Sequence, residues 1–205
     1  MKNLNQIATL SVLWICWCTM HSLLLSRGVI SFFKSTLKEK FAYYRLYYNA
    51  FSFITLLPIS MYHFNLPEVV YFNWPGFWLL LKIAMYIAAF ILFYSGYQVY
   101  DLQYVLGLKQ IREFSEGRSQ EAMDFKTSSI LEYVRHPWYS AGILLVWAFG
   151  NISDVSLVIK VILTLYFIIG TKLEEQKLID EIGEPYRQYC RRVPMLVPWK
   201  KPINR

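Results

Sequence analysis

The sequence predicts an all-α integral membrane protein with about five transmembrane helices, a C-terminal helical hairpin and a cytoplasmic amphipathic tail. Of the 205 residues, 56% are hydrophobic and only 17% are charged, whereas about 25% charged residues are typical of soluble proteins. Long apolar runs recur along the chain, and basic residues gather between alternate pairs of runs. This composition argues against an intrinsically disordered chain and against a nucleic-acid partner.

Five apolar segments are candidates for helices that enter the membrane, because about 20 apolar residues cross the hydrocarbon core as a helix. Pro58 is expected to kink the second segment, and residues 63–75 are expected to form a loop. The fourth segment is shorter than a usual span, so we expect it to form a tight hairpin with the fifth. The expected segments are residues 7–25, 44–62, 76–96, 137–150 and 155–171.

The distribution of basic residues predicts the topology. Most of the 21 lysines and arginines lie in residues 27–45, in the polar stretch 98–134 and in the tail 172–205. The two intervening loops have none, apart from Lys82 and Lys160 just inside the adjacent spans. Under the positive-inside rule this pattern predicts an outside N-terminus and a cytoplasmic C-terminus. The expected organisation is a single membrane domain over residues 1–205, with three spans in 1–97, a cytoplasmic amphipathic connection in 98–134, and the hairpin and tail in 135–205.

Polar and ionisable residues gather at the predicted cytoplasmic ends of the spans. Such groups are costly at membrane depth unless they are paired or solvated, so they indicate a functional site. Helix ends also carry them as interfacial anchors, and that alternative stays open. The cluster consists of His21, Ser22, Arg45, Asn49, Arg135, His136, Glu174 and Glu175.

Four residues of this cluster favour a zwitterionic ligand by their chemistry: Arg135, His136, Glu174 and Glu175. Arg135 and His136 precede Pro137, which suits the first turn of a helix. The positive end of that helix is a good place to hold a carboxylate. Glu174 and Glu175 close the hairpin and are suited to an ammonium group or to ribose hydroxyls. S-adenosylmethionine (SAM) carries a carboxylate, an ammonium, a sulfonium and an adenosine, and we therefore expect it as the cofactor.

The same segments resemble a known family. An ordered series of motifs within about residues 125–200 resembles the isoprenylcysteine carboxyl methyltransferases. The superfamily of these enzymes also includes phospholipid methyltransferases. Residues 21–26 and 44–49 resemble the N-terminal spans of NnrU-like membrane proteins and of methanethiol S-methyltransferases. The C-terminal series is Arg135-His136-Pro137-Trp138-Tyr139, the apolar hairpin, Glu174-Glu175-Gln176-Lys177-Leu178, Gly183, Tyr186, Tyr189 and Val193-Pro194.

The resemblance implies a SAM-dependent methyltransferase that acts on a lipophilic compound, a lipid, or a small thiol or carboxylate acceptor reached from the bilayer. His21 is the candidate general base, with a hydrogen-bonded structural histidine as the alternative. Arg45 and Lys172 complete the predicted catalytic set. The residues implied in cofactor binding are Val134, Arg135, His136, Pro137, Tyr139, Glu174, Glu175, Tyr186 and Tyr189.

Departures from the family pattern bear on the acceptor. Ala141 stands where a glycine is usual, and Thr127-Ser128-Ser129 replaces a Thr-Ser-Gly run. In the family, an arginine shortly before the glutamates helps to bind prenylcysteine. In this chain the only basic residue near that position is Lys172. These changes argue against prenylcysteine more than against SAM.

Two alternatives remain. An NADPH-dependent membrane reductase related to the sterol reductases would share the Arg-His-Pro segment and an Arg-Val-Pro ending. Those reductases carry asparagine where this chain has Trp138. A non-catalytic membrane scaffold is the other alternative.

Overall fold

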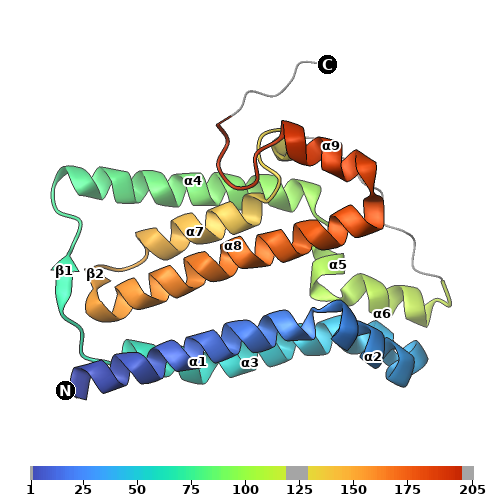
Figure 1. The fold of residues 1–205 in the computed structure, drawn as a ribbon, viewed down its shortest axis with the longest axis horizontal. Coiled ribbons are helices and arrows are strands. Elements are labelled where there is room, and N and C mark those ends of the chain that lie inside the picture. Colours follow the sequence, from blue (N-terminus) through green and yellow to red (C-terminus); the bar gives the residue numbers. More distant parts are fainter. Residues whose placement is uncertain (1, 119–128, 200–205) are drawn as a thin grey trace. The chain divides into compact units, whose positions relative to one another are not determined.

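The computed structural model describes residues 2–118 and 129–199, which are almost wholly helical (Figure 1). Thr127 and Ser128 of the altered family motif lie outside the described residues. In chain order the elements are α1 (Lys2–Leu24), α2 (Arg27–Leu37), η1 (Lys38–Tyr43), α3 (Tyr44–Phe64), β1 (Val70–Phe72), α4 (Phe77–Val99), α5 (Leu102–Leu106), α6 (Leu108–Ser115), η2 (Ser129–Glu132), α7 (Pro137–Ala148), β2 (Ile152–Ser153), α8 (Asp154–Ile182) and α9 (Glu184–Arg192).

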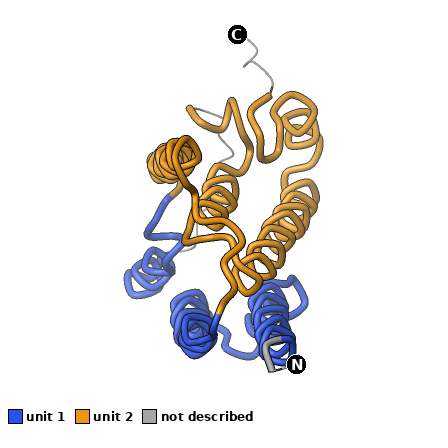
Figure 2. Tube along the Cα trace, turned by 90° about the vertical axis from the view of Figure 1, so that its left-hand side faces the viewer, with its two compact units in different colours: residues 1–67, 101–123 blue, residues 68–100, 124–205 orange. Residues whose placement is uncertain are grey.

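The chain divides into two compact units, coloured separately in Figure 2. Unit 1 comprises residues 1–67 and 101–123, and unit 2 comprises residues 68–100 and 124–205. Unit 1 therefore holds α1, α2, α3, α5 and α6. Unit 2 holds α4, the α7–α8 hairpin and α9.

Three helices in the described part of the chain are long and apolar enough to cross a membrane: Leu4–Leu24, Phe77–Val99 and Asp154–Ile182. The chain is thus an all-helical integral membrane protein, apart from one short pair of strands. The other two expected spans are not among these helices. Helix α3 has 21 residues but carries Arg45 in its first turn and several tyrosines, and α7 has only 12 residues. That five segments span the membrane, with the N-terminus outside, stays a prediction.

Unit 1 is held together by polar contacts between its apolar helices. The Trp17 indole on α1 donates to the Ser52 carbonyl oxygen (3.3 Å) and to Thr55 Oγ1 (3.2 Å) on α3. Arg45 Nε and Asn49 Nδ2 both donate to the Val105 carbonyl oxygen, at 3.2 and 3.0 Å. These bonds fasten the start of α3 to α5.

In unit 2, small residues let α7 lie close to its neighbours. Ser140, Ala141 and Gly142 are all buried, and small residues are the usual means of close helix approach in membranes. On α4, Gly96 leaves room for the Trp138 indole, whose Nε1 donates to the Phe93 carbonyl oxygen at 3.1 Å. The indole therefore binds α7 to α4 by both shape and hydrogen bonding.

The far end of the hairpin is closed by Lys160 of α8. Its ammonium donates to the carbonyl oxygens of Val146 (2.7 Å), Trp147 (3.3 Å) and Phe149 (2.7 Å) at the end of α7. The last carbonyls of a helix have no partner within the helix, and a cation at this end also meets the negative pole of the helix dipole. Lys160 is thus a buried cap for α7.

The turn of the hairpin contains a feature that the sequence analysis missed. Strand β1 lies in the expected loop at residues 63–75 and pairs antiparallel with β2. Strands of two or three residues are too short to leave an alternating pattern in a sequence. After β2, Ser153 and Ser156 form a reciprocal capping box that begins α8.

Helix α8 is longer than expected. The fifth span was predicted to end at residue 171, but α8 continues to Ile182 and ends before Gly183, whose φ is +83°. No proline or glycine interrupts residues 172–182, so the helix persists until a residue that accepts a left-handed backbone. The 20 steps from Asp154 to Glu174 correspond to about 30 Å at ~1.5 Å per residue, which is close to the hydrocarbon thickness. That Glu174 and Glu175 lie at the cytoplasmic end of this span stays a prediction.

Replacing Lys160 with methionine should destabilise the protein, because it leaves buried carbonyls at the end of α7 without a donor. Such losses cost on the order of 1–3 kcal/mol. We expect a lower midpoint of thermal unfolding in detergent. The control is Lys172→Met, an exposed site on the same helix. Equal midpoints for the two variants would contradict the capping role.

Gly96→Ala should also lower the unfolding midpoint, because the added Cβ would collide with the Trp138 indole. Overpacking of this kind typically costs ~1–3 kcal/mol. The matched control is Gly28→Ala, since a Cβ at Gly28 meets nothing within 4 Å. An unchanged midpoint for Gly96→Ala would show that α4 and α7 are not closely packed there.

Candidate functional site

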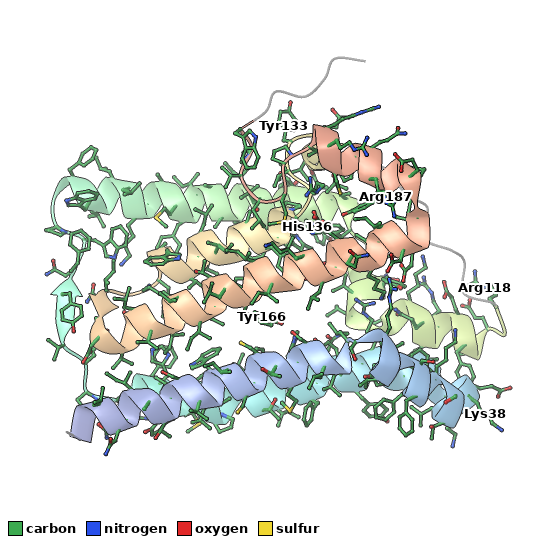
Figure 3. All side chains as sticks on the ribbon, in the orientation of Figure 1. Lys38, Arg118, Tyr133, His136, Tyr166 and Arg187 are labelled. Atoms are coloured by element: carbon green, nitrogen blue, oxygen red, sulfur yellow. The ribbon has the colours of Figure 1, made fainter. Side chains whose placement is uncertain are left out.

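The start of α7 is held by the C-terminal segment that follows α9. The backbone N–H of Arg135 donates to the Pro194 carbonyl oxygen (3.0 Å), and that of His136 donates to Met195 (3.2 Å). Ser140 Oγ donates to the Leu196 carbonyl oxygen at 2.7 Å. The segment thus runs alongside the Arg135-His136 pair, and Figure 3 marks His136 at this end of α7.

The side chains of Arg135 and His136 converge on one carboxylate of α8. Arg135 Nε lies 2.6 Å from Glu175 Oε1, and His136 Nε2 lies 3.1 Å from the same oxygen. The side chains of Arg135 and His136 are only 8% and 4% exposed, and that of Glu175 is 14% exposed. A buried ion pair is expensive to break, because the remaining charge has no compensation. Glu175 therefore fixes the orientation of both residues.

The guanidinium of Arg135 also reaches the chain beyond α8. Its Nη1 donates to the carbonyl oxygens of Cys190 (2.8 Å) and Val193. These contacts of the described residues use Nε and Nη1. Arg135 thereby joins α7, α8 and α9 at a single point.

Two tyrosines of α9 form the apolar base of this junction. Tyr186 and Tyr189 are buried with Val193, and Leu178 and Ile179 of α8 pack against them. The Tyr189 hydroxyl donates to the Leu131 carbonyl oxygen at 2.7 Å. Burial raises the pKa of both tyrosines well above the ordinary value, so both phenols stay neutral. Their position indicates packing and positioning rather than acid–base chemistry.

The structure separates the two glutamates, which were predicted together as cofactor-binding residues. Glu175 points into the buried pair, whereas the side chain of Glu174 is 45% exposed, with Oε2 4.0 Å from His136 Nδ1. Tyr139 presents its ring edge-to-face to the His136 imidazole, with centroids 5.7 Å apart. The Glu174 carboxylate and the Tyr139 ring therefore both lie near the His136 imidazole.

The remaining predicted cofactor residues also lie at this junction. Val134 is fully buried and immediately precedes Arg135, and Pro137 occupies the first turn of α7. All nine predicted cofactor residues belong to unit 2. Whether they bind a cofactor stays a prediction.

The three predicted catalytic residues do not all belong to this junction. His21 and Arg45 are in unit 1, and Lys172 is exposed on α8, one turn before Glu175. His21 Nδ1 lies 2.9 Å from the Tyr48 hydroxyl, and its ring lies against that of Trp17. Arg45 places its guanidinium over the Tyr104 ring in addition to its bond to Val105. Their catalytic roles stay predictions.

Sequence reasoning missed Tyr100 as a neighbour of the site. Its ring lies 4.8 Å from that of Trp138, and burial together with the Glu174 carboxylate raises its pKa. It follows α4 in a segment that was expected to be polar and solvated, and the sequence carries no signal that would have singled it out.

The sequence of the chain is similar to those of several known methyltransferases. The chain is 31% identical over 121 residues to methanethiol S-methyltransferase 1 of Bradyrhizobium diazoefficiens, covering 59% of this chain and 42% of that protein. It is 35% identical over 95 residues to the methanethiol S-methyltransferase of Crocosphaera subtropica, covering 46% and 37% of the two chains. The chain is related to the methanethiol S-methyltransferases. This relationship supports the methyltransferase superfamily expected from the sequence.

A third relative is the methanethiol S-methyltransferase of Pseudomonas deceptionensis, 32% identical over 125 residues, which are 61% of this chain and 43% of that protein. The three matches thus span about two fifths of each relative's own length. No family model matches the chain. No solved structure matches it either.

Glu175→Gln should destabilise the protein strongly, because the Arg135 charge would remain buried without its carboxylate. Removing one partner of a buried pair typically costs ~3–5 kcal/mol. Glu174→Gln is the matched control, and at an exposed position it should change stability by less than ~0.5 kcal/mol. Unfolding of both variants in detergent tests this difference, and equal stabilities would contradict the assignment of the inward-facing glutamate.

Proposed function

We propose that the protein is a membrane methyltransferase that uses SAM to methylate a small thiol. The observation that carries this proposal is the convergence of Arg135 and His136 on Glu175 at the start of α7, in a chain related to methanethiol S-methyltransferases. This arrangement orients a cationic fork beside the positive end of a helix. It is suited to a ligand with both a carboxylate and an ammonium.

The donor and acceptor groups fit SAM. The Arg135 guanidinium and the first N–H groups of α7 would hold the carboxylate. Glu174, partly exposed beside His136, would accept hydrogen bonds from the ammonium or from the ribose hydroxyls. Tyr139 would offer an aromatic face to the adenine or to the sulfonium. Glu175 would act as a positioning residue, since its carboxylate already accepts hydrogen bonds from Arg135 and His136.

The chemistry requires alignment more than acid–base catalysis. When bound, SAM supplies a methyl group on a positively charged sulfur. The thiol sulfur would accept this methyl group in a single displacement, the bonding pair would stay on the former sulfonium sulfur, and the residues of this chain would hold the two sulfur atoms in line. Alignment of this kind can supply up to ~7–11 kcal/mol of the barrier reduction. The thiol proton must leave, and we retain His21, beside the Tyr48 hydroxyl, as the proposed base, with Arg45 and Lys172 as further catalytic candidates.

A small thiol is favoured over a prenylated acceptor. The relatives are named for methanethiol, and the arginine associated with prenylcysteine binding has only Lys172 in its vicinity. Lys172 is exposed on α8, one turn before Glu175. A lipid or other lipophilic acceptor therefore ranks behind the thiol.

The test is methyl transfer by the purified full-length protein in lipid nanodiscs. With methyl-labelled SAM and methanethiol, we expect dimethyl sulfide in equal amount to the SAM consumed, measured by gas chromatography. Arg135→Lys should lower kcat/KM at least about tenfold, because lysine cannot reproduce the planar fork and a lost bond to a charged group is worth ~1.5–3 kcal/mol. Arg187→Gln, an exposed site on α9 (Figure 3), is the control and should retain wild-type activity.

The same preparation distinguishes the alternatives. Saturable NADPH binding without SAM binding would select the membrane reductase, and binding of neither ligand would select the scaffold. Turnover with prenylcysteine or phosphatidylethanolamine but not with methanethiol would keep the methyltransferase and contradict the thiol acceptor. An Arg135→Lys variant that is folded and fully active would contradict the proposed role of the fork.

A further inference from the structure

Helix α2 has one charged face and one apolar face, and the function proposed above uses neither. At 100° per residue, Arg27, Ser31, Lys34 and Lys38 fall on one side of the helix. All four of these side chains are exposed. The apolar residues of α2 occupy a broad arc centred away from that side, from about 140° to 300° around the helix from Arg27: Phe32, Val29, Phe33, Leu37 and Ile30.

The apolar face is only partly covered by the rest of unit 1. The Phe33 ring lies 5.1 Å from that of Tyr44 at the start of α3, and this contact anchors α2 to the bundle. Phe32 is 63% exposed and Leu37 is 37% exposed. Thr36 does not interrupt this face as a free polar group, because its hydroxyl donates to the Phe32 carbonyl oxygen at 2.9 Å.

The position of α2 along the chain limits what can cover this face. Helix α1 has 23 residues, or about 34 Å at ~1.5 Å per residue, which suffices to cross the hydrocarbon core. It ends at Leu24, and α2 begins at Arg27. The first turn of α2 therefore emerges at the level of the lipid headgroups. A helix at that depth with opposed basic and apolar faces is suited to lie along the interface.

We propose that α2 is an interfacial helix that binds anionic lipid headgroups. Phe32 and Leu37 enter the acyl boundary, while Lys34 and Lys38 meet phosphate groups from the opposite face. Lys38 caps the helix with a positive φ of +50°, which directs the chain away from the helix at its basic end, and Figure 3 marks Lys38 there. Lys40 in η1, also exposed, extends the same charge.

Hydrogen exchange of the full-length protein tests this proposal. The protein is placed in nanodiscs of phosphatidylcholine alone, or with one quarter phosphatidylglycerol, and the amides of residues 27–37 are followed by mass spectrometry. An isolated helix of 11 residues is marginally stable in water, so its protection reports its binding to the surface. We expect slower exchange in the phosphatidylglycerol nanodiscs, and high salt should reduce the difference because it screens exposed charges.

Two variants separate charge from folding. Lys34→Gln with Lys38→Gln should lose the lipid-dependent protection, by roughly fivefold for each lysine. Lys34→Arg with Lys38→Arg keeps the charge and should keep the protection. Equal exchange of α2 in the two kinds of nanodisc would overturn the proposal, and so would lipid-dependent protection that survives in the glutamine variant.

Discussion

The geometry of unit 2 depends on a single carboxylate oxygen. Glu175 Oε1 accepts from both Arg135 and His136 within a site that is largely closed to solvent. The buried guanidinium of Arg135 and the imidazole of His136 lie at the start of a helix, and the Arg135 charge faces the positive end of the helix dipole. Without a carboxylate from α8, neither could remain buried. The hydrogen bonds from Arg135 to the carbonyl oxygens of Cys190 and Val193 then fasten the C-terminal segment to the same point.

The rest of unit 2 holds α7 and α8 in the register that this contact needs. The hairpin is fixed at its far end by Lys160, which binds the final carbonyls of α7, and at its middle by small residues that allow close approach. A shift of α8 by one residue would turn Glu175 about 100° away from α7. The capping box at Ser153 and the lysine cap therefore contribute to the site from the other end of the hairpin.

Much of this arrangement could be predicted from the sequence, and the parts that could not have physical causes. Apolar length predicted α1, α4 and the core of α8, and the Arg135-His136-Pro137 series predicted the start of α7. The extension of α8 to Ile182 was missed because charged residues were taken as the end of a span, although helices continue readily through them. The strand pair was missed because its strands are too short to show a period. The separate roles of Glu174 and Glu175 were unreadable, since adjacent positions differ by 100° around a helix and only packing decides which one faces inward.

The central claim is that this junction in unit 2 holds the methyl donor. Ultraviolet crosslinking of radiolabelled SAM to the full-length protein, followed by peptide mapping, tests it most directly. The account predicts saturable labelling, displaced by excess unlabelled SAM, on peptides that contain residues 134–139 or 174–189. Labelling confined to peptides of unit 1, or no saturable labelling at all, would contradict it.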